Sequence, residues 1–225
     1  MPFNSFAELV LNTVKGEDYD IVVVKRDAGT SIVAIHGGQI EPPTGELARA
    51  IAAEDCNLYT FCGLRADSAA QLRIPVNRYD EMRLQALMEH SQEALALLGA
   101  EGDAPKVHLG GRNQALKRVL SDHLEAAGFE VAGPVSPGAA HDPTRFYNRP
   151  ANGGVQMELS SGLRQALLPG PQTPCFGALV DAIRAAIADY HAEQRDDVTR
   201  ALERFERATR AMPPSICKPH RHSSH

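Results

Sequence analysis

The sequence predicts an α/β fold in which helices pack on a mixed, mostly parallel sheet. Short apolar stretches typical of buried strands alternate along the chain with amphipathic stretches typical of helices. The chain has 225 residues, 43% of them hydrophobic, which is enough to bury one substantial core. We therefore expect one domain over residues 1–212, followed by a disordered tail over residues 213–225.

The expected strands follow the apolar stretches. Asp20–Val24 and Ile32–Ile35 read as two buried strands around a turn, and the second ends at His36. Further strands are expected at Asn57–Cys62, Ala94–Leu98, Lys106–Leu109, Phe129–Ala132 and Val155–Leu159. Ligands of such sheets bind beyond the carboxyl ends of strands, where His36 and Leu159 would both lie.

The expected helices show helical spacing of apolar residues. They cover Thr44–Glu54 with Thr44 as the N-cap, Glu81–Ala94, Asn113–Ala127 and Gly177–Arg210. The last stretch forms one helix or two with a break near Asp196, and it either covers the sheet or pairs two chains. The residues between 135 and 150 are rich in Pro and Gly and predict a long loop, a place where function often resides.

Composition excludes several classes of function. The net charge of −5, without a Lys/Arg stripe, argues against a general nucleic-acid binder. The longest apolar runs are far shorter than the roughly 20 residues of a membrane helix, so no membrane association is expected. The four cysteines show no paired zinc-binding spacing and predict reduced structural thiols. The N-terminus carries acidic residues where a secretory signal would be basic and then apolar, so we expect a cytoplasmic protein.

The first chemical motif is AIHGGQIEPPTGELA, residues 34–48. An apolar strand leads to His36, a Gly-Gly turn follows, and Glu41 comes five residues after the histidine. Imidazole nitrogen and carboxylate oxygen are ligands that suit Zn²⁺, and the turn would fold both side chains toward one point. An incidental His and Glu at the end of a strand would give the same spacing, so the spacing alone leaves both interpretations open.

Two further motifs lie close together in the sequence. In GVQMELSSGLR, Glu158 shares one strand face with Gln156, so it could act as a general base; alternatively, it pairs with Arg164 at a strand edge. In RFYNRPANGG, the arginines could bind a carboxylate through their planar fork of donors, or they are simply solvated.

The chain resembles the poly-γ-glutamate hydrolases of phages and bacteria. AIHGGQIEPPTGELARAIA, VHLGGRNQAL and YNRPANGGVQMELSSGLR occur in the order seen in that family, and the similarity runs from about Tyr19 to Arg164. The resemblance implies a zinc-carboxypeptidase-like α/β domain that hydrolyses γ-glutamyl amide bonds, in poly-γ-glutamate or a related acidic peptide-like substrate, with a metal-activated water. A phage-encoded protein of this kind would be released by lysis.

The resemblance also implies roles for individual residues. His36 and Glu41 fall on metal positions, Glu158 on the position of the catalytic base, and Asn148 and Arg149 on a substrate-binding pair. The family's third ligand is a histidine at the end of a strand, and here Leu98 occupies that place.

The missing histidine leaves two hypotheses open. In the first, another group completes the zinc site of an active amidase, and His108 is the nearest substitute. In the second, the protein is a catalytically impaired relative that binds acidic peptides or polymers in the same cleft. The histidines of the tail, at positions 220, 222 and 225, could bind adventitious metal. The sequence makes no prediction of the oligomeric state.

Overall fold

A seven-stranded sheet forms the centre of the structure, a computed structural model that describes residues 3–211. Its strands are β1 (Tyr19–Val24), β2 (Thr30–Gly38), β3 (Asn57–Gly63), β4 (Glu93–Ala100), β5 (Lys106–Gly111), β6 (Glu130–Ala132) and β7 (Gly154–Ser160). Their order in the sheet is β1-β3-β2-β4-β7-β5-β6. The pairs β1–β3 and β5–β7 are antiparallel and the other four are parallel, so the structure confirms a single α/β domain with a mixed, mostly parallel sheet.

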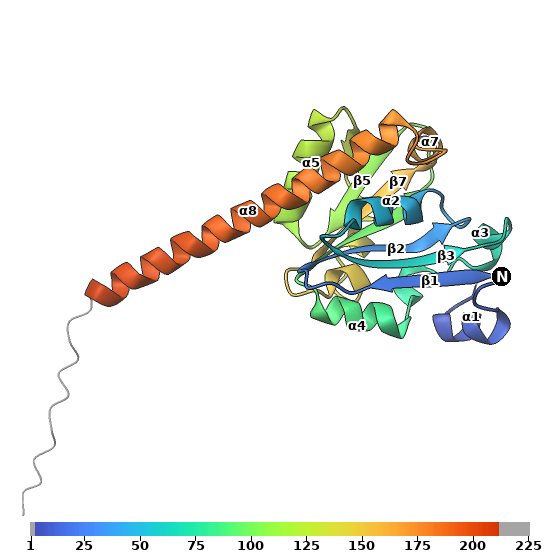
Figure 1. The fold of residues 1–225 in the computed structure, drawn as a ribbon, viewed down its shortest axis with the longest axis horizontal. Coiled ribbons are helices and arrows are strands. Elements are labelled where there is room, and N and C mark those ends of the chain that lie inside the picture. Colours follow the sequence, from blue (N-terminus) through green and yellow to red (C-terminus); the bar gives the residue numbers. More distant parts are fainter. Residues whose placement is uncertain (1–2, 212–225) are drawn as a thin grey trace, which may run out of the picture.

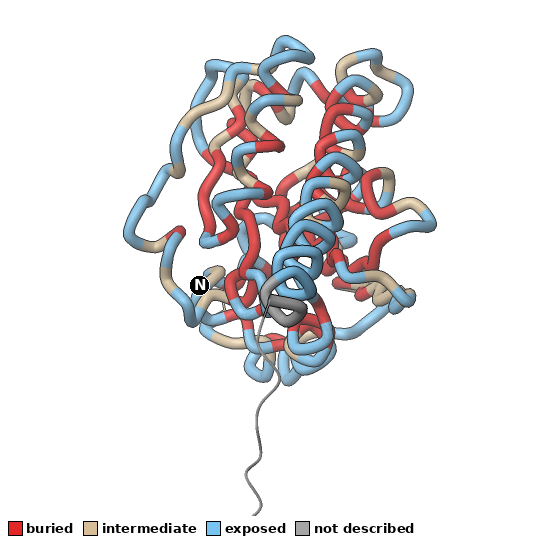
Figure 2. The backbone as a smooth tube through the Cα atoms, turned by 90° about the vertical axis from the view of Figure 1, so that its left-hand side faces the viewer, coloured by how far each residue is buried: buried red, intermediate tan, exposed pale blue. Residues whose placement is uncertain are grey.

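Helices cover both faces of this sheet (Figure 1). One face packs against α2 (Thr44–Ala52), α5 (Gln114–Ala126) and the first half of α8 (Pro174–Ala211), with Leu47, Leu120 and Ile183 in one apolar cluster. The other face packs against α4 (Met82–His90) and the short turn η2 (Phe146–Asn148). Figure 2 shows the buried part of the chain between these outer elements.

All seven expected strands are present, with ends that differ from expectation by at most three residues. Alternating apolar side chains make these segments predictable because a central strand is buried on both faces. The first two strands, β1 and β2, are not hydrogen-bonded to each other, because β3 lies between them in the sheet.

Two helices depart from expectation, and for a third the structure decides between two alternatives. Thr44 is the first residue of α2 rather than its cap, and Pro43 takes the N-cap position. Helix α4 ends at His90 because Glu93–Ala100 enters the sheet. Helix α8 is one helix without a break near Asp196, and its second half projects from the body (Figure 1). Val198 and Leu202 in that half are exposed.

Several short elements had no expectation from the sequence. They are α1 (Phe6–Asn12), α3 (Ser68–Gln71), η1 (Val76–Arg78), α6 (Pro137–Ala140) and α7 (Ser161–Ala166). Two of the short helical turns, α6 and η2, lie inside the stretch expected to be a long loop. The tail with its three histidines lies outside the described residues.

Within residues 3–211 we find no helix with the length and apolar character of a membrane span.

Candidate functional site

The candidate site lies at one edge of the sheet, where parallel strands β2, β4 and β7 end side by side. His36 lies near the end of β2, where the pairing with β3 is irregular between Ala34 and Gly37. Gly38 then adopts a φ of 62°, a left-handed conformation that favours glycine. The chain reverses there, and the Glu41 amide donates to the His36 carbonyl oxygen over 2.8 Å. The turn therefore folds both side chains together, as the motif predicted.

Glycine is also needed where this turn meets the first residues of α2. A Cβ on Gly37 would lie 3.1 Å from the Gly45 Cα and 3.0 Å from the Cys62 Sγ. The hydroxyl of Thr44 donates to the His36 carbonyl oxygen over 3.3 Å, which ties the helix start to the strand end. The close approach of turn and helix fixes the position of Glu41 relative to His36.

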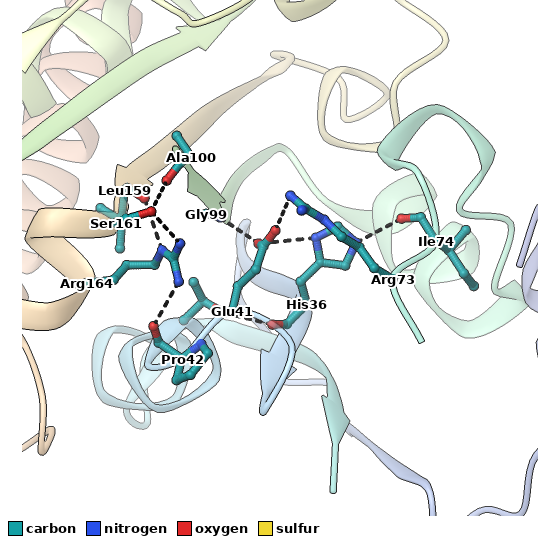
Figure 3. A network of polar contacts seen from close by, with 11 residues as sticks. His36, Glu41, Pro42, Arg73, Ile74, Gly99, Ala100, Leu159, Ser161 and Arg164 are labelled. Carbon is teal, nitrogen blue, oxygen red and sulfur yellow. Dashed lines mark hydrogen bonds and ion pairs between the residues drawn. The ribbon is translucent and has the colours of Figure 1, made fainter. Parts of the chain in front are cut away.

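The buried His36 ring is oriented by a backbone carbonyl. Its Nε2 lies 2.8 Å from the Ile74 carbonyl oxygen, which can only accept, so Nε2 carries the proton. The other ring nitrogen, Nδ1, lies 3.2 Å from Glu41 Oε2 (Figure 3). A histidine that binds a metal commonly donates its other ring N–H to a carbonyl in this way.

The buried Glu41 carboxylate lies among groups that favour its charge. Oε2 accepts from the Gly99 amide over 2.6 Å, and Oε1 lies 2.6 Å from Nη2 of Arg73 (Figure 3). Burial would raise the pKa of Glu41, but His36, Arg73 and the Gly99 amide together hold it below its ordinary value. Glu41 is therefore an ionised carboxylate at neutral pH.

Two buried atoms of this pair are suited to a divalent cation. Neither His36 Nδ1 nor Glu41 Oε1 has a hydrogen bond of acceptable geometry, although both have close charged neighbours. Nitrogen and carboxylate oxygen match the ligand chemistry of Zn²⁺. Among residues 3–211, however, no group of three His, Cys, Asp or Glu side chains gathers around one point. Among the described residues the pair thus offers two candidate ligand atoms, and no third His, Cys, Asp or Glu side chain joins them.

His108 does not join the pair, contrary to its expected role as a third ligand. It lies directly opposite Glu158 on neighbouring strands, and Leu98 lies opposite Glu158 on the other side. Strand β7 thus separates His108 from the strands that carry the pair. The Nδ1 atom of His108 donates to the Gly133 carbonyl oxygen over 3.0 Å.

Glu158 is a half-buried carboxylate near the same edge. Its Oε2 accepts from the Val135 amide over 3.3 Å. Burial raises the pKa of Glu158, although the Val135 amide, the Gln156 side chain and His108 oppose the rise. The alternative ion pair with Arg164 is absent among the described contacts, because that guanidinium donates to the Leu159 and Pro42 carbonyls and to the Ser161 hydroxyl.

Asn148 and Arg149 lie away from the His36–Glu41 pair. The buried Asn148 amide donates to the carbonyls of Ala140 and Asp142 and accepts from the Arg112 amide, so it braces its own loop. Arg112, which donates to Asn148, directly follows the end of β5, and that end lies beside the start of β7. Glu158 lies toward the other end of β7, so Asn148 and Glu158 are separated along this strand. The exposed Arg149 donates to the Thr144 carbonyl oxygen over 3.3 Å.

At the site, Arg73 and Gly99 had no expectation from the sequence, and Arg164 was considered there only as an ion-pair partner of Glu158. Arg73 and Arg164 both approach Glu41, and Gly99 leaves room for them: a Cβ there would lie 2.9 Å from Glu41 Cδ and 3.0 Å from Arg164 Nε. The sequence signal that marks them is weak. Gly99 is only the end of an apolar run in the sequence. Arg73 and Arg164 are far from Glu41 in the sequence, so no local pattern predicts that they come near it.

The fold and site define an α/β protein with a candidate hydrolytic centre at the carboxyl ends of its strands. Residues 3–172 match the family model described as poly-gamma-glutamate hydrolase, and the chain belongs to this family.

Two curated relatives come from Bacillus subtilis (strain 168). The UPF0714 protein YndL is 29% identical over 168 residues, and the SPbeta prophage-derived UPF0714 protein YoqZ is 27% identical over 168 residues. Both alignments cover 73% of this chain, but only 66% of YndL and 61% of YoqZ. The chain therefore spans less than two thirds of the length of these relatives.

Two solved structures are similar over most of the chain. A bacteriophage poly-gamma-glutamate hydrolase superposes with a TM-score of 0.79 at 25% identity, covering 84% of this chain and 98% of its own. The zinc-free apo form of YndL superposes with a TM-score of 0.74 at 24% identity, covering 83% and 96%. The second similarity shows the shared fold.

Proposed function

We propose that this protein is a zinc-dependent hydrolase of γ-glutamyl amide bonds, acting on poly-γ-glutamate or a related acidic peptide-like substrate. The observation that carries the proposal is the buried His36–Glu41 pair. The Ile74 carbonyl fixes the ring so that Nδ1 faces the ionised carboxylate, and two of the pair's atoms have no hydrogen bond of acceptable geometry. Membership of the hydrolase family and the zinc-free description of apo YndL support the same proposal.

His36 Nδ1 and Glu41 would hold the metal ion. Zn²⁺ bound by such ligands supplies Lewis-acid polarisation of a carbonyl and activation of water. Positions that the two side chains leave open are available to water and substrate. The Gly99 amide and the Ile74 carbonyl would keep both ligands in place, since each bonds an atom of one of them.

Glu158 would move the proton. Its raised pKa lets the carboxylate accept a proton from water and then release it to the leaving amine, because a group of intermediate pKa can do both. The Val135 amide, which donates to Oε2, keeps the carboxylate oriented from the loop side.

Positive charge close to the pair would recognise an acidic substrate. The chain carries a net charge of −5, so a polyanion needs a local basic region. Arg73 and Arg164 approach Glu41 from two sides and provide it. Arg149 stands on a neighbouring loop and would engage more distant carboxylates of a long polymer, while Asn148 would hold that loop in shape.

The test is cleavage of poly-γ-glutamate by the purified chain after addition of one equivalent of Zn²⁺. Polymer length is followed by size-exclusion chromatography, with poly-α-glutamate as the matched polymer of equal charge. We expect shortening of the γ-linked polymer alone, and loss of that activity in excess chelator. Intact polymer at high concentrations of zinc-loaded protein would refute the hydrolase.

One observation favours a second candidate, a relative that binds acidic polymers without cleaving them. Arg73 already places a positive charge against Glu41, and Leu98 stands where the resemblance implies a third ligand. The two candidates differ in one measurement. A non-catalytic binder retains intact poly-γ-glutamate in equilibrium dialysis whether or not Zn²⁺ is present.

A further inference from the structure

The C-terminal half of α8 leaves the body of the protein as an exposed helix. Ion pairs tie α8 to the body as far as Glu193, whose carboxylate lies 2.6 Å from Nη2 of Arg118 in α5. Beyond it, every residue from 195 to 207 is exposed, and the helix continues to Ala211 (Figure 1). Most helical stability in proteins comes from packing of an apolar face, so a long exposed helix calls for a partner surface.

An apolar stripe runs along this exposed helix. Val198, Leu202 and Phe205 follow one another at intervals of four and three residues, which places them on one face. Their exposed fractions are 59%, 58% and 69%. Ile187 lies eleven residues before Val198 and so on the same face, but it is buried in the apolar cluster beneath the first half of α8. The stripe therefore continues the face by which α8 packs on the sheet.

Charged residues of both signs flank the stripe. Asp197 and Arg204 are seven residues apart, about two turns, and lie along one edge. Arg195 and Glu206 are eleven residues apart, about three turns, and lie along the other edge. Both pairs are centred on the same point, between positions 200 and 201. A two-fold axis at that point sets each acidic residue beside the basic residue of its pair in an antiparallel second copy, so the face is complementary to itself.

Antiparallel pairing also fits the length of the exposed helix. The axis lies near the middle of the part between Glu193 and Ala211, so two copies overlap along nearly all of it, and each body stands beyond the end of the other helix. A parallel pair would place equal residues at the same level and form neither charge pair. Among the described residues, Arg204 has no ion pair, and Asp197 lies 2.6 Å from Arg200 on its own helix. The Arg204 charge is thus available to a second copy.

We propose that the exposed part of α8 is a homodimer interface, in which the apolar stripe of one copy packs antiparallel on the stripe of a second copy. The inference goes beyond the proposed function and depends on neither metal nor hydrolysis. A single helix pair contacts less surface than a standard interface, so we expect a dissociation constant in the micromolar range. Below that concentration the chain is a monomer, Leu202 stays exposed, and its truncation costs little stability.

The experiment is sedimentation equilibrium of the full chain over concentrations that span the micromolar range. Leu202→Glu places a charge in the stripe, and the control Met82→Glu adds the same charge at an apolar residue of α4 that is 82% exposed. We expect a reversible monomer–dimer equilibrium in the wild type and in Met82→Glu, and dimerisation at least about tenfold weaker in Leu202→Glu. A wild type that stays monomeric, or equal dimerisation of all three proteins, would overturn the inference.

Charge reversal tests the orientation of the pair. Asp197→Arg turns two attractive contacts of the dimer into repulsive ones, so we expect about tenfold weaker dimerisation. Combination with Arg204→Asp restores opposite charges and should return the dissociation constant to within about threefold of the wild type. Circular dichroism checks that helix content is unchanged in both variants. Unaltered dimerisation of the single variant, or no recovery in the double variant, would refute antiparallel pairing.

Small-angle X-ray scattering of the dimer tests the same orientation without a substitution. Antiparallel pairing puts the two bodies at opposite ends of the helix pair, so we expect a second maximum in the pair-distance distribution at high protein concentration. A single maximum would indicate two bodies side by side, as in a parallel pair or a dimer through another surface, and would overturn the proposed interface.

Discussion

Glu41 and Glu158 are two carboxylates whose surroundings move their pKa values in opposite directions. Positive neighbours and an amide hold the pKa of Glu41 low, whereas burial raises the pKa of Glu158. A difference between the pKa values of two carboxylates gives them different chemical roles, because one stays charged and the other can exchange a proton. The low-pKa group is the metal ligand in our proposal, and the other is the proton carrier.

Glu158→Gln tests the role of the proton carrier. The amide is isosteric but cannot accept the proton, so we expect kcat for polymer cleavage to fall by about 10²–10⁴-fold. Zinc content and circular dichroism are the controls, and both should stay unchanged. Cleavage by Glu158→Gln at the wild-type rate would remove Glu158 from the mechanism.

The same substitution has a stability effect that does not depend on activity. Because the folded pKa of Glu158 is raised, the folded state binds this proton more tightly than the unfolded state, and the charged form costs stability above that pKa. We expect Glu158→Gln to have the higher Tm near pH 8 and to lose this advantage as the pH falls through the raised pKa. A Tm difference that does not vary with pH would contradict the raised pKa.

Leu98→His tests the third-ligand position implied by the family resemblance. Leu98 is buried beside Glu158, so a histidine there lowers stability in metal-free protein, by about 1–3 kcal/mol, as an unsatisfied polar group does. We expect Zn²⁺ to restore that loss and to bind more tightly than in the wild type. Weaker zinc binding in a chelator competition would show that the position does not face the pair.

Local sequence patterns predicted the pair but not the groups around it. His36 and Glu41 are five residues apart and share one turn, so a strand followed by Gly-Gly was enough to place them together. Arg73 and Gly99 come from segments far along the chain, and only the order of the strands brings them to Glu41. His108 lies apart from the pair because β7 stands between β4 and β5, an order that the sequence does not show.

At the scale of elements, the strands were more predictable than the helix ends. A buried strand needs a run of apolar residues, which the sequence shows directly, whereas α4 ends where β4 must enter the sheet. Helix α8 has one residue pattern along its length but two environments. Its first half covers the sheet through residues such as Leu179 and Ile183, and its second half projects beyond the body.

This difference within α8 predicts unequal costs for similar substitutions. Ile183→Ala removes a fully buried side chain and should lower the free energy of unfolding by about 2–5 kcal/mol. Leu202→Ala changes an exposed side chain and should alter it by no more than about 0.5 kcal/mol. Urea denaturation gives both values. A large cost at Leu202 would show that another surface covers the projecting half.

At the scale of the whole molecule, two apolar clusters on opposite faces of the sheet support the fold, so it should not depend on metal for folding. Zinc should still stabilise it by mass action. A free ion at 100 times its Kd adds about 2.7 kcal/mol, or about 5–10 °C in Tm for a domain of this size.

Calorimetry with and without Zn²⁺ checks this shift. We expect His36→Ala to abolish it. His123→Ala should preserve it, because that ring only pairs with Asp189 on the surface. Loss of the shift in both variants, or in neither, would contradict a metal position at His36.

The most direct test of the central claim is the rate of γ-glutamyl bond cleavage measured while Zn²⁺ is titrated into metal-free protein. We expect the rate to rise linearly and to reach a plateau at one zinc ion per chain, with no activity in Glu41→Gln at any ratio. A rate that is the same before and after zinc addition, or no cleavage at full occupancy, would contradict a zinc-dependent hydrolase built on His36 and Glu41.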